Sequence, residues 1–223
     1  MARAHHSDRV ELTPAILLTV SGDDIPTRPS TYGVEAWAAW RDSYRVALGL
    51  AKEDVPDGVH IAIRRIDTPR LLDAVIDTQL STPPRSSQLR TRASTEPTST
   101  AVLSCSSSGS VVSTPTCCVD LSCGIQDWVG LARDRRPDWT TIWTGHPAVL
   151  ARAVEDTVEV SEQSDNARPH AAARFSLEDF RNAVDQALAD REMFASRLGR
   201  RLRERGHAKP AETARTIAGL TQQ

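Results

Sequence analysis

Four cysteines are the first residues whose chemistry needs to be considered, because thiolates bind zinc and form disulfides. Cys105, Cys117, Cys118 and Cys123 all lie in one short stretch. A structural zinc site needs paired cysteines two to four residues apart, so that two short segments wrap one ion, and these four lack that spacing. An intracellular chain keeps its thiols reduced. We therefore expect reduced thiols in or under a strand, with a disulfide and a zinc site as the alternatives.

Two further groups carry side chains that bind metals. His5 and His6 stand near Asp8 at the N-terminus, and Asp23 and Asp24 follow a glycine. Histidines at a chain end are usually solvated, and the acidic pair lacks the ligand pattern of a calcium-binding loop. We predict no metal site, and we expect the acidic pair to form a polar turn.

The sequence contains no recognisable nucleophile or phosphate-binding motif. The serine run 106–110 does not match the G-x-S-x-G elbow, and neither G-x-x-x-x-G-K-[ST] nor G-x-G-x-x-G occurs. We therefore assign no catalytic residue and no cofactor. An enzyme of an unrecognised family, with catalytic residues brought together only by folding, is one alternative.

Five arginines close to the C-terminus form a basic cluster that could neutralise phosphates. They are Arg197, Arg200, Arg201, Arg203 and Arg205. Such a cluster at the end of a helix would give salt-sensitive binding of nucleic acid. The formal net charge of the chain is −2, which weakens this interpretation. An arginine-rich regulator that binds nucleic acid is therefore an alternative rather than the leading function.

A long helix must carry this cluster. Ser176 and Asp179 resemble a capping box, and Phe175 and Phe180 have the spacing of a hydrophobic staple. Gly206 is a stop signal. The acidic residues fall mainly in the first half and the arginines at the end, which complements the helix dipole. The pattern predicts a helix over residues 176–205.

One face of the predicted helix is apolar. An apolar stripe left in water is unfavourable, so it must pack on its own domain, on a second copy or on another protein. We predict a partner interface there, through self-association or a protein partner. The interface residues are Phe180, Val184, Leu188, Phe194, Leu198 and Leu202, with Ala195 as an alternative to Phe194.

The remaining elements follow from periodicity and turn residues. Alternating or β-branched stretches predict strands at 10–20, 59–63 and 139–143, and more weakly at 111–121. Apolar residues three and four apart predict helices at 34–51, 69–80, 125–133, 147–158 and 210–220. Thr68 and Pro69 suit the cap and first position of the second of these helices.

Residues 81–116 differ in composition from the rest of the chain. Half of them are Ser or Thr, and Glu96 is their only acid. Large apolar groups are too few to offset the entropy lost on ordering, so we expect an extended loop over at least 81–100. The abrupt change also fits an out-of-frame reading of a GC-rich gene.

Composition places the chain among ordinary globular proteins. Hydrophobic residues make up 39% and charged residues 25% of 223 residues, and of the basic residues only Lys52 and Lys209 are lysines. No apolar run is long enough for a membrane span, and no signal-peptide core follows Met1. We therefore expect no membrane contact and a place in the cytoplasm or in a particle assembled inside the cell.

These observations predict an α+β fold, in which a small mixed sheet packs against helices. We expect an α+β domain over 8–160, interrupted by the segment 81–116, and a helical C-terminal arm over 174–223. The leading functional expectation is a non-enzymatic structural or assembly protein that acts through protein–protein contacts, with a virion component as one form of it.

Overall fold

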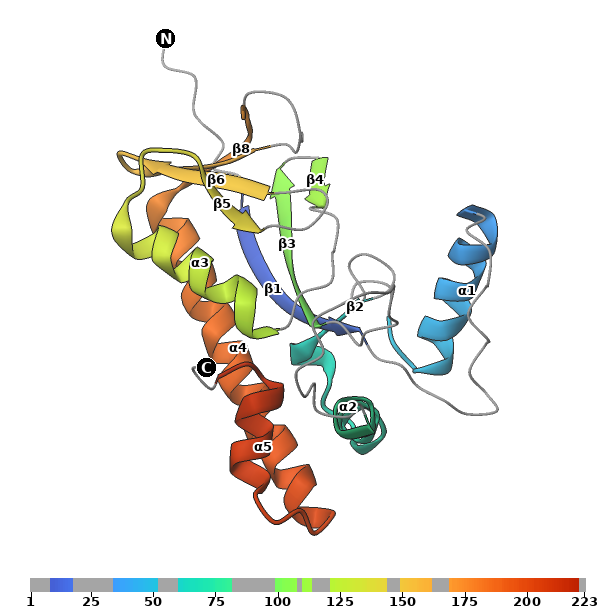
Figure 1. Ribbon diagram of the computed structural model, residues 1–223. Coiled ribbons are helices and arrows are strands. Elements are labelled where there is room, and N and C mark those ends of the chain that lie inside the picture. Colours follow the sequence, from blue (N-terminus) through green and yellow to red (C-terminus); the bar gives the residue numbers. More distant parts are fainter. Residues whose placement is uncertain are drawn as a thin grey trace, which may run out of the picture.

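The computed structural model describes residues 9–17, 34–51, 60–81, 99–107, 110–113, 121–143, 149–161 and 169–220. These residues form five α-helices and two four-stranded antiparallel sheets, which confirms the predicted α+β class (Figure 1). The helices are α1 (Val34–Ala47), α2 (Pro69–Ser81), α3 (Leu121–Asp134), α4 (Leu177–Glu204) and α5 (Pro210–Ile217). A short 3₁₀ turn, Ile63–Arg65, precedes α2.

The first sheet has the strand order β2-β1-β3-β4. Its strands are β1 (Arg9–Leu17), β2 (His60–Ala62), β3 (Ser99–Ser107) and β4 (Ser110–Ser113). Leu12 of β1 faces Leu103 of β3 in the antiparallel register. The Ser/Thr-rich segment thus contributes β3 and β4, where we expected a loop up to residue 100 and a strand only from 111. Strand pairing with β1 supplies the backbone hydrogen bonds that composition alone could not predict. Residues 82–98 lie outside the described residues.

The second sheet has the order β5-β6-β7-β8. Its strands are β5 (Thr140–Trp143), β6 (Val149–Val154), β7 (Thr157–Ser161) and β8 (Ala171–Ser176). The predicted helix at 147–158 is wrong, because this stretch forms the β6–β7 hairpin. Val149, Ala151 and Ala153 are buried and alternate with half-buried neighbours, which is the two-residue period of a strand. Glu155 adopts a positive φ of 52° at the turn. Strand β8 was not predicted.

Buried side chains gather in two clusters, which we call the first core and the second core. The first core joins β1, α3 and the second sheet to the first half of α4, through Leu12, Trp128, Leu131, Ala151, Val158, Phe175, Phe180 and Val184 among others. The second core joins the end of α1, β2 and α2 to the second half of α4 and to α5, through Tyr44, Leu48, Ile61, Val75, Phe194, Leu198, Leu202 and Ile217 among others.

Helix α4 runs through both cores (Figure 1). It begins where the sequence predicts, because the Ser176 hydroxyl accepts a hydrogen bond from the Asp179 amide at 3.0 Å and donates one to the Asp179 carboxylate at 2.7 Å. It ends at Glu204, and Gly206 just beyond has a φ of +76°. The His207 amide donates to the Leu202 carbonyl and the Gly206 amide to the Arg203 carbonyl, both at 3.0 Å. These bonds form a Schellman-type ending.

Helix α5 folds back against the second half of α4 (Figure 1). Gly199 lies at this contact, where a Cβ atom would be in ordinary van der Waals contact with the Ala214 Cβ at 3.6 Å. Arg191 of α4 is 1% exposed and donates to the carbonyls of Ala218 and Gly219, just beyond the end of α5. A cation at a helix C-terminus is favourable, because the unpaired carbonyls there carry partial negative charge.

Most of the other predicted elements appear close to their predicted bounds. Helices α1, α2, α3 and α5 and strands β1, β2 and β5 correspond to the predictions at 34–51, 69–80, 125–133, 210–220, 10–20, 59–63 and 139–143. The Thr68 hydroxyl accepts from the Leu71 amide at 3.3 Å, as expected for the cap of α2. The division into an 8–160 domain and a 174–223 arm stays a prediction, although α4 shares both cores with the preceding residues.

Candidate functional site

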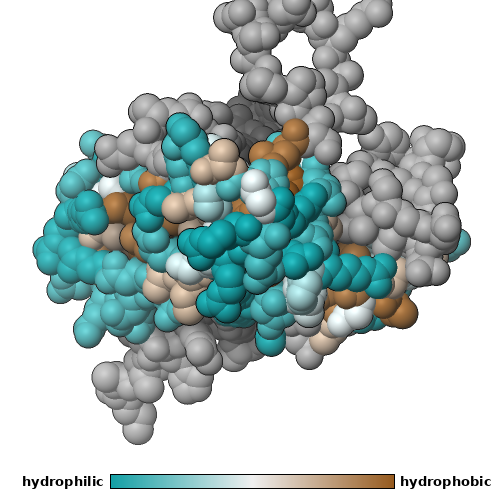
Figure 2. Space-filling model, turned by 90° about the horizontal axis from the view of Figure 1, so that it is seen from below, coloured by the Kyte–Doolittle hydropathy of each residue, from teal (hydrophilic) through white to brown (hydrophobic). Residues whose placement is uncertain are grey.

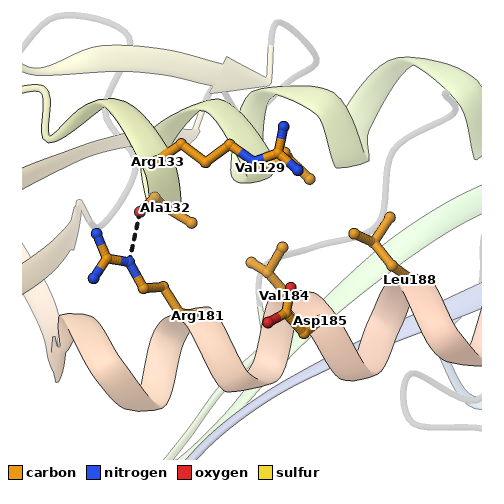
Figure 3. A pocket seen from close by; sticks show the side chains of 7 residues that line it. All are labelled: Val129, Ala132, Arg133, Arg181, Val184, Asp185 and Leu188. Carbon is orange, nitrogen blue, oxygen red and sulfur yellow. Dashed lines mark hydrogen bonds between the residues drawn. The ribbon is translucent and has the colours of Figure 1, made fainter.

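A groove between α3 and α4 is the opening that we consider as a functional site (Figure 3). It has a volume of about 360 Å³, which is within the usual range for ligand pockets. Val129, Ala132, Val184 and Leu188 supply its apolar surface, and its charged lining residues are Arg133, Arg181 and Asp185.

The first core fixes the two walls of the groove. Trp128 of α3 and Phe180 of α4 lie next to each other with their ring centroids 5.8 Å apart, and both are buried. Their neighbours Val129 and Val184 are therefore held at the base, where they are 7% and 3% exposed. Leu188 is only partly buried. The groove is thus a surface extension of a packed core, and its apolar base is preorganised.

Arg181 ties the two helices together at one end of the groove. Its Nε donates to the Ala132 carbonyl at 2.8 Å, near the C-terminal end of α3. Its two terminal nitrogens point away from that carbonyl (Figure 3). The exposed side chain of Arg133 extends along the other wall beside Val129 (Figure 3). Two guanidinium groups against the one carboxylate of Asp185 leave the groove with a net positive charge.

The chemistry of this lining is that of recognition. A guanidinium fork pairs with a carboxylate through two parallel hydrogen bonds, and the apolar base can accept an aliphatic side chain. Among the residues that the structure describes, the lining contains no Ser, Cys, His or Lys side chain. Among the described residues no three His, Cys, Asp or Glu side chains are grouped as a metal ion would require. The groove therefore fits a ligand that is partly apolar and partly acidic.

The predicted metal-binding and nucleophilic residues are only partly described. His5, His6, Asp8, Asp23, Asp24, Cys117 and Cys118 lie outside the described residues. Cys105 lies in β3 and Cys123 in α3, with backbone positions alone described. The expectations about zinc, disulfides and reduced thiols stay predictions.

Three of the five clustered arginines are held by partners within the chain. Arg201 makes a two-pronged ion pair with Asp73 of α2, at 2.8 and 2.6 Å, and also bonds Glu204. Arg205 bonds Asp77 at 2.8 Å. Arg197 donates to the Arg64 and Ile66 carbonyls at 3.1 and 3.3 Å. These contacts join α4 to α2 and to the turn before it.

The network changes the acidity of Asp73. The hydrogen bond from Arg201 lowers the pKa of the Asp73 carboxyl, partial burial acts in the opposite direction, and the charges of Arg201 and Arg205 lower the pKa further. The net result is a pKa below the usual value. The carboxylate of Asp73 in turn raises the pKa of Arg201. Asp73 is therefore ionised and paired over a wider pH range than a solvated aspartate.

Arg200 and Arg203 differ from the other three arginines. Both are exposed and neither has an ion-pair partner within the described part of the chain. In the view of Figure 2, the molecular face is mainly hydrophilic, and its hydrophobic side chains form small separate groups. Among the described residues, two of the five clustered arginines rather than all five are therefore unpaired and able to bind phosphates. Nucleic-acid binding stays a prediction.

The predicted interface stripe is packed mainly inside the chain. Phe180 and Val184 belong to the first core, and Phe194, Leu198 and Leu202 belong to the second core. Each of these five is at most 3% exposed. A partner contact through them would first require α4 to leave both cores. Leu188 differs, because it is partly exposed and lines the groove. The interface itself stays a prediction.

A second charged cluster, formed by one glutamate and two arginines of the second sheet, was not predicted from the sequence. Glu159 lies at the centre of the second sheet on the face opposite the first core, and it is 8% exposed. Arg152 of β6 and Arg174 of β8 bond its two carboxylate oxygens at 2.7 and 2.9 Å. Arg152 also lies 4.7 Å from the ring centroid of Trp139. Burial raises the pKa of Glu159, but the two arginines outweigh it and the net pKa is lowered.

Of the groove residues, the sequence marks only Val184 and Leu188, as members of the apolar stripe of α4. Val129 and Arg133 stand about fifty positions before Arg181 and Leu188, and only the packing of α3 on α4 brings them together.

Comparisons with protein-family models, curated proteins and solved structures found no match. No family therefore assigns a role to any of these side chains.

No helix within the described ranges has the length and apolar character of a membrane span.

Proposed function

We propose that this chain is a non-enzymatic assembly protein that acts through protein–protein contacts, and that the α3–α4 groove is one such contact. The observation that carries the proposal is the combination of an apolar base with two arginines and one aspartate, on walls fixed by the first core. Interfaces commonly combine a buried apolar centre with charged groups at the rim.

Leu188 is the residue that best tests the groove. It is partly exposed, so a change there is tolerated better than one at Val129 or Val184. Leu188→Arg adds a third cation and fills part of the apolar surface. Met193→Arg is the matched control, because Met193 also lies on α4, is 46% exposed and does not line the groove.

The measurement is the solution mass by size-exclusion chromatography with light scattering, over a range of concentrations. The intact chain and Met193→Arg should both exceed the 24.4 kDa of one copy, whereas Leu188→Arg should remain at that mass. An assembly that survives Leu188→Arg would show that the groove is not the contact. A single copy in all three proteins would contradict self-assembly and would require a different protein as partner.

A further inference from the structure

Helix α1 presents an exposed face whose charge is opposite to that of the groove. Its C-terminal end is anchored in the second core by Tyr44 and Leu48, which are 4% and 7% exposed. The rest of the helix extends away from α3 and α4 (Figure 1). An amphipathic helix that stands out from its own fold is a common form of recognition element.

Four exposed residues lie along one face of α1. Their spacing of four, three and four places them on a single stripe, and all are exposed: Glu35, Ala39, Asp42 and Val46. Val46 is 65% exposed, the highest value among the exposed large hydrophobic side chains of the described residues. The stripe combines two carboxylates with one small residue and one unburied aliphatic side chain. That is the chemistry which the groove fits. Asp42 also pairs with Arg45 of the same helix at 3.8 Å, whereas Glu35 has no ion pair within the described residues.

The lengths of the two surfaces also agree. Glu35 and Asp42 are two helical turns apart, or about 10 Å along the axis. Arg181 and Leu188 are separated by the same two turns along the groove wall. Arg181 marks one end, and the guanidinium of Arg133 extends along the groove (Figure 3). The groove wall between Arg181 and Leu188 is thus as long as the acidic stretch of α1, and Ala39 allows close approach to the base.

We propose that α1 of one copy of this chain docks in the α3–α4 groove of a second copy. Glu35 then faces Arg133, and Val46 covers apolar surface of the groove. The inference rests on the proposed function and names its partner as the chain itself. If each copy supplies both a helix and a groove to the other, the pairing closes as a symmetric dimer.

Charge reversal tests the pairing without touching either core. Glu35→Arg and Arg133→Glu alter exposed side chains, and each should weaken self-association about tenfold by placing like charges together. The double variant should recover to within about threefold of the intact chain, because the opposite charges face each other again. Sedimentation velocity over a concentration series gives the dissociation constants, and circular dichroism checks the fold.

Two matched variants complete the experiment. Arg200→Glu makes the same charge change on an exposed arginine outside the groove and should leave the dissociation constant unchanged. Val46→Ser removes the exposed aliphatic group and should weaken association several-fold, whereas Met193→Ser should not. If Val46→Ser had no effect, α1 would not be the docked element.

The outcomes separate the two proposals. Self-association that is lost in Leu188→Arg but unaffected by Glu35→Arg would overturn the α1 pairing and retain the groove as an assembly contact. Two weakened single variants without recovery in the double variant would also overturn the direct pairing. A chain that never self-associates would overturn the pairing as well, and a peptide copy of residues 34–47 that fails to bind the intact chain would then exclude this helix as the ligand.

Discussion

At the scale of single residues, the charged side chains of this protein join segments far apart in the sequence. Arg201 and Asp73 are separated by 128 positions, yet their two hydrogen bonds connect α4 to α2. Arg191 binds the carbonyls that follow α5. The contribution of each ion pair to the free energy of unfolding depends on how far the pair is shielded from solvent, since exposed ion pairs stabilise a fold only slightly. Asp73 is the clearest test, because its side chain is 30% exposed and accepts from two arginines.

Asp73→Asn should lower the thermal midpoint near neutral pH by a few degrees, since the charged hydrogen bonds are weakened. The folded pKa of Asp73 is below the unfolded value of about 3.9. The stabilisation is therefore complete above that value and is lost as the pH falls through the folded pKa. Calorimetry should show the wild-type and variant midpoints converging as the pH falls below the unfolded value.

Asp127→Asn is the control for this pH dependence. Asp127 is exposed and forms no ion pair within the described residues. Its variant should follow the wild-type curve at every pH. A difference for Asp73→Asn that stayed constant from pH 7 to pH 2 would mean that the carboxylate is not the source of the effect.

At the scale of elements, α4 determines how the two cores are coupled. A helix of 28 residues has one side that contacts the second sheet and α3, and further along it contacts α2 and α5. Because one rigid element belongs to both clusters, losing either cluster removes support from the other. We expect the described part of the chain to unfold as a cooperative unit, in the manner of a single domain.

Phe180→Ala tests this coupling. Phe180 is fully buried in the first core, so its truncation should cost about 3–5 kcal/mol. Hydrogen exchange followed by mass spectrometry should show faster exchange in α2, which lies in the second core, as well as in α3. Met193→Ala, at a 46% exposed position on the same helix, should change little. Unchanged exchange in α2 would divide the protein into two independent units.

At the scale of the whole molecule, residues 171–220 are structural parts of the fold. They supply β8 to the second sheet, and they supply buried side chains of α4 to both cores and of α5 to the second core. The predicted arm over 174–223 was inferred from an amphipathic pattern that would suit either a free helix or an integrated one. The observed packing favours integration, because Phe180, Phe194 and Leu202 are all fully buried.

Deletion of residues 174–223 should therefore abolish native folding. The remaining chain would expose the apolar surfaces of α2, α3 and the second sheet, and such surfaces lead to aggregation. Circular dichroism and light scattering on the purified fragment are the measurements. A folded, single-copy fragment 1–173 would establish the predicted arm as a true appendage.

The sequence by itself determined the features that depend on neighbours along the chain. The cap at Ser176, the stop at Gly206 and the cap at Thr68 are set by residues within a few positions of one another, so α4 and α2 begin or end where predicted. The α+β class followed from the same local periodicities. The hairpin at 149–161 was missed, because short apolar runs fit a helix or a strand equally well until a pairing partner is present.

Only the tertiary structure decided what the side chains of α4 face. Leu188 and Arg181 line a groove because α3 packs beside them, whereas Phe194 and Leu202 are covered by α2 and α5. An amphipathic stripe predicts that one face of the helix is buried, but it does not predict which element covers that face. The sequence likewise does not predict the partner of Arg201. An arginine can bind phosphate, but this one forms an ion pair with Asp73. Long-range packing, which leaves no trace in local spacing, assigned these residues their partners.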